Sequence, residues 1–337
     1  MKHVLALMFT ASLAQAVSAS PPSADAWREA NERVDKAGGW KAYARETQAE
    51  KGPDGLTGAQ ALGGLLSIED ALKRARSIEP AREQTLASVS RKHTDYPSLR
   101  DHERAALTHE ARMVAQVSTL YLAAVAAQER VTHRQQVAEV ASIAAELATR
   151  MQKVGNLNVL HQAEERLSAA QTQRALSEAR VSAGAAREAL IRRLQLNGAQ
   201  AEFRLPARLP DAPGVPSALS TTDSVLLSIE STSPEVIALQ SDVRQALLAR
   251  NEAHAQVQHH RKELLPLQKQ ISEEHLLHYN GMIIGVFELL KDAKHQTEAV
   301  EAYLRALLAY WQAEHALTPT VFALREQLAQ FRRDAWK

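Results

Sequence analysis

The 337-residue chain contains no cysteine, few aromatic residues and no apolar run long enough to span a bilayer as a helix. The lack of cysteine excludes disulfide bonds, so the fold must depend on packing. Only 4% of the residues are aromatic although 45% are hydrophobic, which indicates closely approaching Ala- and Leu-rich helices rather than one thick globular core. Lys and Arg number 40 against 39 Asp and Glu, and this balance argues against a nucleic-acid partner.

The sequence also lacks the motifs of common enzyme classes. It has no Gly-rich phosphate loop, no Gly-x-Ser-x-Gly elbow and no His-Glu-x-x-His pair. The carboxylates of Glu273, Glu274 and Asp292 are interpreted as solvated charges on exposed helix faces. We therefore predict a protein that is not an enzyme and needs no cofactor.

Residues 1–19 have the features of an export signal. A charged start precedes the apolar run Val4–Leu13, and Val17-Ser18-Ala19 supplies small residues for signal peptidase, with Ala14-Gln15-Ala16 as a second candidate. The apolar run is shorter than the roughly 20 residues that a spanning helix needs. We expect an exported protein with a signal peptide over residues 1–19.

One pattern occurs twice in the remaining chain: a long, Ala-rich helix with apolar periodicity stops at a glycine and is followed by a second long helix. The first break is Val154-Gly155-Asn156, and the second is Tyr279-Asn280-Gly281-Met282. The predicted division is a peripheral N-terminal segment 20–66, a first helical repeat 67–197 with its turn near 155, a Pro-rich crossover 198–222, a second helical repeat 223–317 with its turn near 281, and a C-terminal tail 318–337.

Apolar residues spaced by threes and fours predict which helices pair. The stripe that runs from Leu107 to Val154 is too long for the wall of a compact domain and predicts a partner helix over 157–196. In the second repeat, Ser233 and Pro234 predict a helix start, and Pro266 predicts a kink. The seam expected on the partner helix of the first repeat consists of Leu160, Ala163, Leu167, Ala170, Leu190 and Leu194. The predicted fold is all-α, with elongated antiparallel coiled-coil helical hairpins in two internal repeats.

Three segments carry a family resemblance: Arg150–Leu157 with the following Gln162-Ala163-Glu164, the Pro-rich crossover, and Leu264–Leu290 continuing to Glu314. Over residues 100–317 the chain resembles the TolC-type outer-membrane efflux family, in the branch found beside heavy-metal and copper pumps. The resemblance implies a trimeric export duct that conducts passively and is gated at its periplasmic tips. Each subunit of such a duct contributes two helical hairpins to a periplasmic tunnel and two β-hairpins to an outer-membrane barrel.

The same resemblance implies the partners and the site. A periplasmic adaptor and an inner-membrane efflux transporter would dock at the helical tips, and the chain would act in the periplasm or at the periplasmic face of the outer membrane. The tip positions carried over in this way are Val154, Gly155, Leu157, Tyr279, Asn280, Gly281 and Met282.

The sequence departs from the family pattern before both long helices. The family's β-strands would precede these helices, but the stretch 76–97 is polar and favours helix, and 234–250 has a helical pattern throughout. The expected fold is therefore TolC-like with no evident β-barrel. The first turn lacks the family's usual acidic residue, and the second is one residue tighter than the common form. The alternatives are a component of an export system, co-assembly with a full-length homologue, and a barrel-less periplasmic coiled-coil interaction protein.

A further alternative is periplasmic metal binding. His275 and His278 lie one helical turn apart, and Glu274 precedes His278 by four residues, which makes a weak partial ligand set. Surface histidines on a polar helix face are more often simply hydrated, so we predict no metal site. The aromatic residues Tyr303 and Trp311 are expected to pack in a seam rather than to bind a ligand.

Overall fold

The computed structural model describes residues 64–78, 84–87, 89, 96, 99–216 and 218–334. The predicted signal peptide and nearly all of segment 20–66 lie outside the described residues. The described residues belong to one compact unit, Gln60–Lys337. Their β structure is limited to an isolated parallel bridge between Leu65 and Arg204. The predicted all-α fold class is confirmed.

Long helices account for most of this unit. The 53-residue α6 is about 80 Å long at 1.5 Å per residue. The elements in chain order are α4 (Ile68–Ser77), α6 (Asp101–Lys153), α7 (Val159–Leu194), the 3₁₀ turn η2 (Gly198–Ala201), α8 (Thr221–Ser228), α9 (Pro234–His259), the π-helical turn η3 (His260–Leu264), α10 (Leu265–Asn280) and α11 (Val286–Asp334).

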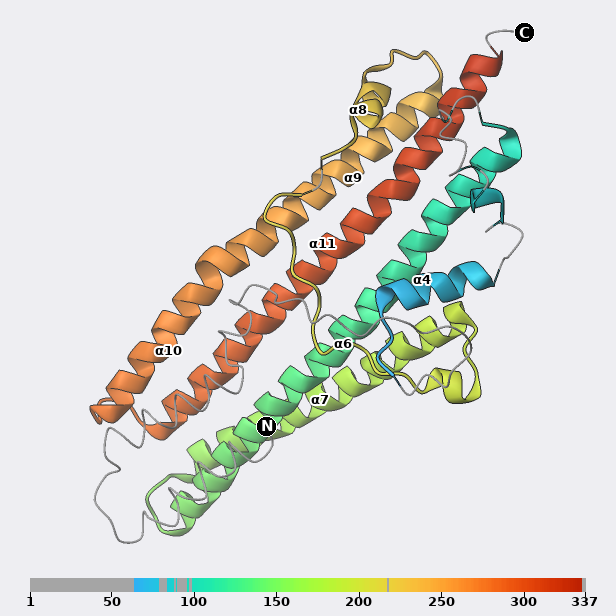
Figure 1. The fold of residues 1–337 in the computed structure, drawn as a ribbon. Coiled ribbons are helices and arrows are strands. Elements are labelled where there is room, and N and C mark those ends of the chain that lie inside the picture. The colour runs from blue at the N-terminus through green and yellow to red at the C-terminus, as the bar shows by residue number, and fades with distance from the viewer. Residues whose placement is uncertain are drawn as a thin grey trace. The chain divides into compact units, whose positions relative to one another are not determined.

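The helices form two antiparallel hairpins that pack side by side (Figure 1). The first hairpin pairs α6 with α7, and the second pairs α11 with α9, η3 and α10. The hairpins meet where α6 packs against α11. The long helices are therefore arranged as a row in the order α7, α6, α11, α9–α10, in which α7 and α9–α10 are the edge helices.

Side chains at the helix starts explain where several elements begin. The Ser67 hydroxyl accepts a hydrogen bond from the backbone N–H of Asp70 at 3.1 Å, which caps α4. The predicted start at Ser233 and Pro234 is the start of α9. The short helix α4 ends at Ser77, and residues 84–87 are again helical.

The C-terminal tail predicted for 318–337 is corrected by the structure, since α11 continues through Pro319 to Asp334. Proline removes one helix hydrogen bond, which costs about 3 kcal/mol in an isolated helix interior. Burial of apolar side chains between α11 and α9 offsets that cost here. The apolar cluster that α11 forms with α9 consists of Val236, Val243, Leu317, Val321, Leu324 and Leu328.

The kink predicted at Pro266 takes the form of a widened turn directly before it. Within η3 the backbone N–H of Leu265 donates to the carbonyl of His260, five residues back. A proline ring clashes with the carbonyl four residues earlier in a regular α-helix, and a π turn relieves such a clash by widening the helix. The helix axis therefore continues from α9 into α10.

The Pro-rich crossover is extended, as predicted, and is anchored on three helices. Ala212 within it is buried. The anchors are Leu209 N–H to the Glu129 carboxylate at 3.0 Å, Trp311 Nε1–H to Pro210 O at 2.8 Å, Tyr303 O–H to Asp211 Oδ1 at 3.4 Å, and His254 Nε2 with Pro213 O at 2.8 Å. Glu129 lies on α6, His254 on α9, and both aromatic donors on α11, so the crossover ties the two hairpins together.

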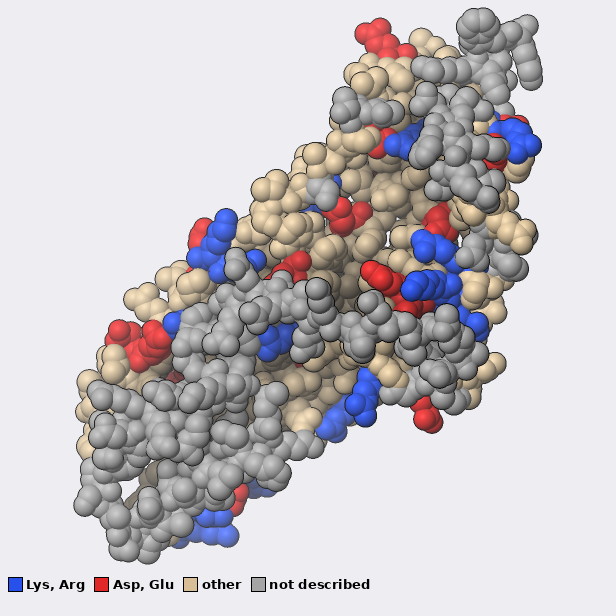
Figure 2. Space-filling model, viewed as in Figure 1, with Lys and Arg blue, Asp and Glu red and all other residues tan. Residues whose placement is uncertain are grey.

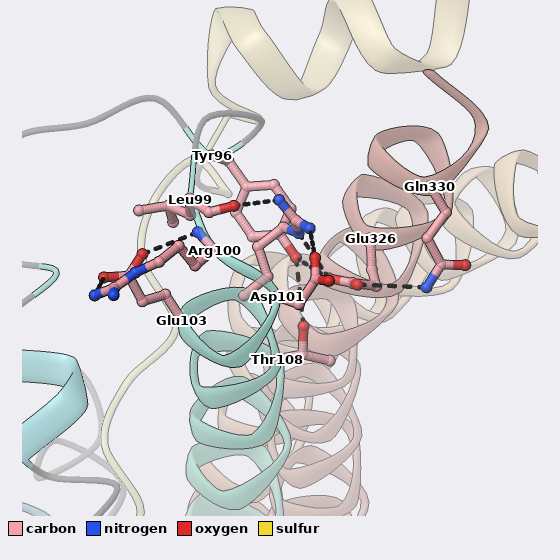
Figure 3. A network of polar contacts seen from close by, with 9 residues as sticks. Tyr96, Leu99, Arg100, Asp101, Glu103, Thr108, Glu326 and Gln330 are labelled. Atoms are coloured by element: carbon pink, nitrogen blue, oxygen red, sulfur yellow. Dashed lines mark hydrogen bonds and ion pairs between the residues drawn. The ribbon is translucent and has the colours of Figure 1, made fainter. Parts of the chain in front are cut away.

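A polar network joins the start of α6 to the last turns of α11 (Figure 3). The Tyr96 hydroxyl donates to Glu326 Oε2 at 2.8 Å, and Gln330 donates to the other Glu326 oxygen at 3.4 Å. The buried Arg104 guanidinium lies 3.8 Å from Glu326 and also bonds Asp101. This end of the seam between the hairpins is therefore fixed by charge as well as by packing.

Candidate functional site

The turn that ends the first hairpin is a Schellman motif. The N–H of Gly155 donates to Gln152 O at 3.0 Å, and the N–H of Asn156 donates to Met151 O at 2.9 Å. The carbonyls of the last turn of α6 are satisfied in this way. Asn158 then caps α7 by accepting from the N–H of His161.

The turn that ends the second hairpin has the same hydrogen bonds. The N–H of Met282 donates to Tyr279 O at 3.0 Å, and the N–H of Ile283 donates to His278 O at 2.8 Å. Both turns comprise five residues, 154–158 and 281–285. The two tips are therefore structural equivalents, in which Met282 takes the place of Gly155.

The glycine in the second tip is not at the left-handed position. Gly155 has a φ of 78°, as the motif requires, whereas Gly281 has a φ of −78° and the left-handed residue is Met282, with a φ of 59°. A residue with a side chain costs roughly 1–2 kcal/mol in this conformation. The second tip thus contains local backbone strain at Met282, a position where the sequence has no glycine.

The two tips lie next to each other. The ring of His161 on α7 meets the ring of Phe287 on α11 edge to face, with centroids 5.0 Å apart. Of the predicted tip residues, Gly155, Asn280 and Gly281 are exposed, and Leu157 and Tyr279 are half-buried. Six large apolar side chains are exposed around the two turns, and we call them the tip patch: Val154, Val159, Leu160, Leu277, Met282 and Ile283.

The edge helices carry a second set of exposed apolar side chains, which we call the edge residues: Leu167 and Val181 on α7, Ile237 and Leu248 on α9, Leu264 in η3, and Leu267 and Ile271 on α10. The middle helices α6 and α11 expose few large apolar side chains. Among their described residues, Phe331 is the one that is exposed. Exposed apolar surface is therefore concentrated on the outer edges of the row.

This distribution corrects part of the predicted seam. Leu160 and Leu167 are 69% and 59% exposed, and Ala163 and Ala170 are exposed as well. Leu190 and Leu194 of the predicted seam are buried on the side of α7 that faces α6, together with Thr172, Leu176 and Ala179. The stripe at 160–170 has the spacing of a helix-packing face, but none of the helices that the structure describes packs on it.

The candidate metal residues do not form a ligand set. Glu274 and His278 are exposed, while His275 Nδ1 lies 3.2 Å from Asp292 Oδ1 on α11. Asp292 is only 3% exposed, which corrects its assignment to a solvated face, and it also accepts from Gln268 at 3.2 Å. Within the described part of the chain, no group of three or more His, Asp or Glu residues could hold a metal ion.

The charged residues visible in Figure 2 are interspersed in sign and form no patch of a single sign. None of the helices described in the structure is long and apolar enough to cross a membrane. The surfaces that stand out are therefore the tip patch and the edge residues, which suit apolar contact with other protein.

Comparisons with known proteins agree with this description at the level of fold. No family model matches the chain, and no curated protein matches it in sequence. A structure of CusC, described in terms of folding and transmembrane channel formation, matches with 13% identity and a TM-score of 0.50 over 65% of this chain and 70% of CusC. The outer-membrane channel OprN matches with 12% identity and a TM-score of 0.50 over 75% of this chain and 70% of OprN. The chain therefore has the helical-hairpin fold of these channel proteins.

Proposed function

We propose that the protein belongs to the TolC-type outer-membrane efflux family and is a component of, or derived from, a tripartite export system for metal ions or small toxic solutes. It acts as a passive duct or scaffold in the periplasm or at the periplasmic face of the outer membrane. The fold shared with CusC and OprN supports this proposal. The resemblance of residues 150–157 and 264–290 to the family supports it from the sequence.

The observation that carries the proposal is the placement of apolar surface on both edges of the helix row. An edge formed by α7 and a different edge formed by α9–α10 cannot cover each other within one chain, because α6 and α11 lie between them. Two different complementary faces give a heterologous contact, which closes into a ring when the rotation between copies allows it. We propose a homotrimer, in which α7 of one copy packs on α9–α10 of the next.

The mass of the particle tests this arrangement. In the double variant Leu167→Lys and Val181→Lys, two charges would have to be buried in the contact between copies, so we expect monomers. The matched control is Gln116→Lys with Gln128→Lys, two exposed positions on the middle helix α6. Light scattering after size exclusion should show oligomers for the parent and the control. A parent chain that is monomeric at all concentrations would refute the ring.

The tip patch is proposed to bind a periplasmic adaptor, which connects to an inner-membrane efflux transporter. Gly281→Asp tests this contact, because a Cβ at Gly281 meets neighbours at no less than 3.4 Å and the backbone there is not left-handed. The charge is therefore added beside Met282 and Ile283 without breaking the turn. Gly281→Ala is the matched control.

The assay is binding to a purified efflux adaptor from the same cell, with helicity measured by circular dichroism. We expect Gly281→Asp to lose binding and Gly281→Ala to keep it, both at parental helicity. Equal binding by the two variants would rule out docking at this tip.

The main alternative is a barrel-less periplasmic coiled-coil protein that binds other envelope proteins. Release of the chain from membranes by carbonate would favour it, and retention only in the presence of a full-length homologue would favour co-assembly. Periplasmic metal binding has no support from the arrangement of Glu274, His275 and His278.

A further inference from the structure

The seam between the two hairpins contains a buried carboxylate in which only one of the two oxygens accepts a hydrogen bond. Glu301 on α11 is 7% exposed, and its Oε2 atom accepts from Arg134 Nη2 on α6 at 2.5 Å. Its Oε1 atom is buried and receives no hydrogen bond from any described residue. A buried acceptor without a donor is destabilising, and more so when it carries charge.

The charged groups around Glu301 come from three elements. Arg130 and Arg134 face it from α6, and Arg305 faces it from its own helix. His260 of η3 lies within electrostatic range of Arg305. Burial raises the pKa of the Glu301 carboxyl above its ordinary value, and the three guanidinium groups lower it without cancelling that effect.

The sign of the resulting pH dependence follows from this direction. A carboxyl whose pKa is raised in the folded protein binds a proton more readily there than in the unfolded chain. Its contribution to stability is fully present below the ordinary carboxyl pKa and is lost as the pH rises through the raised one. Protonation also gives Glu301 an O–H donor and removes a buried charge.

The part of the second hairpin between Glu301 and the tip is thinly packed. No residue of α10 is buried, and the buried residue of α11 before Glu301 is Asp292. The π turn η3 interrupts the regular helix at the level where His260 approaches Arg305. Segments with few buried contacts open at low free-energy cost, so a modest change in stability at Glu301 has a large effect on this region.

We propose that the seam between the hairpins senses protons through Glu301: acidification neutralises the carboxyl and tightens α11 against α6, and ionisation loosens the tip half of the second hairpin. The Arg134 guanidinium keeps the ionised state accessible at neutral pH. This device belongs to the chain itself and does not depend on the proposed role in export.

His260 acts in the opposite direction and must be separated from Glu301. Burial lowers its pKa, with smaller effects from His259 and Arg305, so its protonation is disfavoured in the folded protein. Acid therefore removes stability through His260 while it adds stability through Glu301. His260→Gln should enlarge the tightening on acidification.

The absence of native cysteine allows spin labels to report the seam directly. Labels at Lys153→Cys on α6 and Lys291→Cys on α11 occupy exposed positions in the two hairpins. Pulsed electron resonance should give a narrow distance distribution at about pH 4, below the ordinary carboxyl pKa, and a broader one at about pH 8. In Glu301→Gln the distribution should be narrow at both values. The matched control, Glu288→Gln at an exposed position of α11, should behave like the parent.

A second variant keeps the proposal testable if Glu301→Gln alters the fold. In Arg134→Met the carboxyl loses its nearest cation, so the transition to the narrow distribution should move to higher pH. A parent distribution that is the same at all pH values overturns the proposal. So does a pH response in Glu301→Gln equal to that of the parent, or an unchanged transition in Arg134→Met.

Discussion

The left-handed backbone at Met282 predicts that this turn would be more stable with glycine at position 282, although the sequence has its glycine at 281. Met282→Gly should strengthen the second tip, because glycine relieves a strain of roughly 1–2 kcal/mol while its greater freedom in the unfolded chain costs about 0.4–1 kcal/mol. The Met282 side chain is 82% exposed, so little burial is lost. The net gain lies between about 0 and 1.6 kcal/mol, and the mid-range values give about 0.8 kcal/mol.

Hydrogen exchange at the tip measures this gain. The amides of Met282 and Ile283 donate the two hydrogen bonds of the turn, and the expected stabilisation slows their exchange by about 2–5-fold. Gly281→Ala should also be neutral or mildly protective, because its φ of −78° suits any residue. Gly155→Ala, at a φ of 78°, should accelerate exchange in the first tip. Faster exchange in Met282→Gly than in the parent would refute the assignment of strain.

Two further predictions concern burial. Burial raises the pKa of Tyr96, Tyr121 and Tyr303 to about 12, so stability contributed by these phenols should be lost as the pH rises from about 10 to about 12. Burial raises the pKa of Tyr310 as well, so tyrosinate absorbance should show a late-ionising group that includes these four residues, and Tyr121→Phe should remove one residue from it. Leu190→Ala, at a fully buried site, should lower the free energy of unfolding in urea by about 2–5 kcal/mol, whereas Leu167→Ala should change it by less than about 0.5 kcal/mol; equal losses would contradict the division of α7 into buried and exposed faces.

The sequence predicted the hairpins well because the signals for them are local. Apolar spacing marked α6, where Val117, Tyr121 and Val125 are buried, and both tip glycines lie in the turns. The start of α9 follows from Ser233 with Pro234. Each of these features depends on residues within one or two helical turns of one another.

The predictions of burial are wrong where burial depends on which other helix packs on a helix face. The spacing of Leu160 and Leu167 predicts that something packs on them, but spacing cannot tell a helix of the same chain from one of another copy. Asp292 is buried because Gln268 and His275 reach it from α10, and α11 continues through Pro319 because α9 packs on it. In the second tip, Gly281 lies one residue before the left-handed position, which Met282 occupies.

Cysteine cross-linking across the edges tests the ring most directly. The chain has no native cysteine, so Leu167→Cys on α7 and Ile271→Cys on α10 create one thiol on each edge. Under mild oxidation the double variant should give covalent dimers and a closed trimer as the largest product, and each single variant should give neither. An uncross-linked double variant, or cross-linking by the Leu167→Cys variant alone, would contradict the pairing of α7 with α10 between copies.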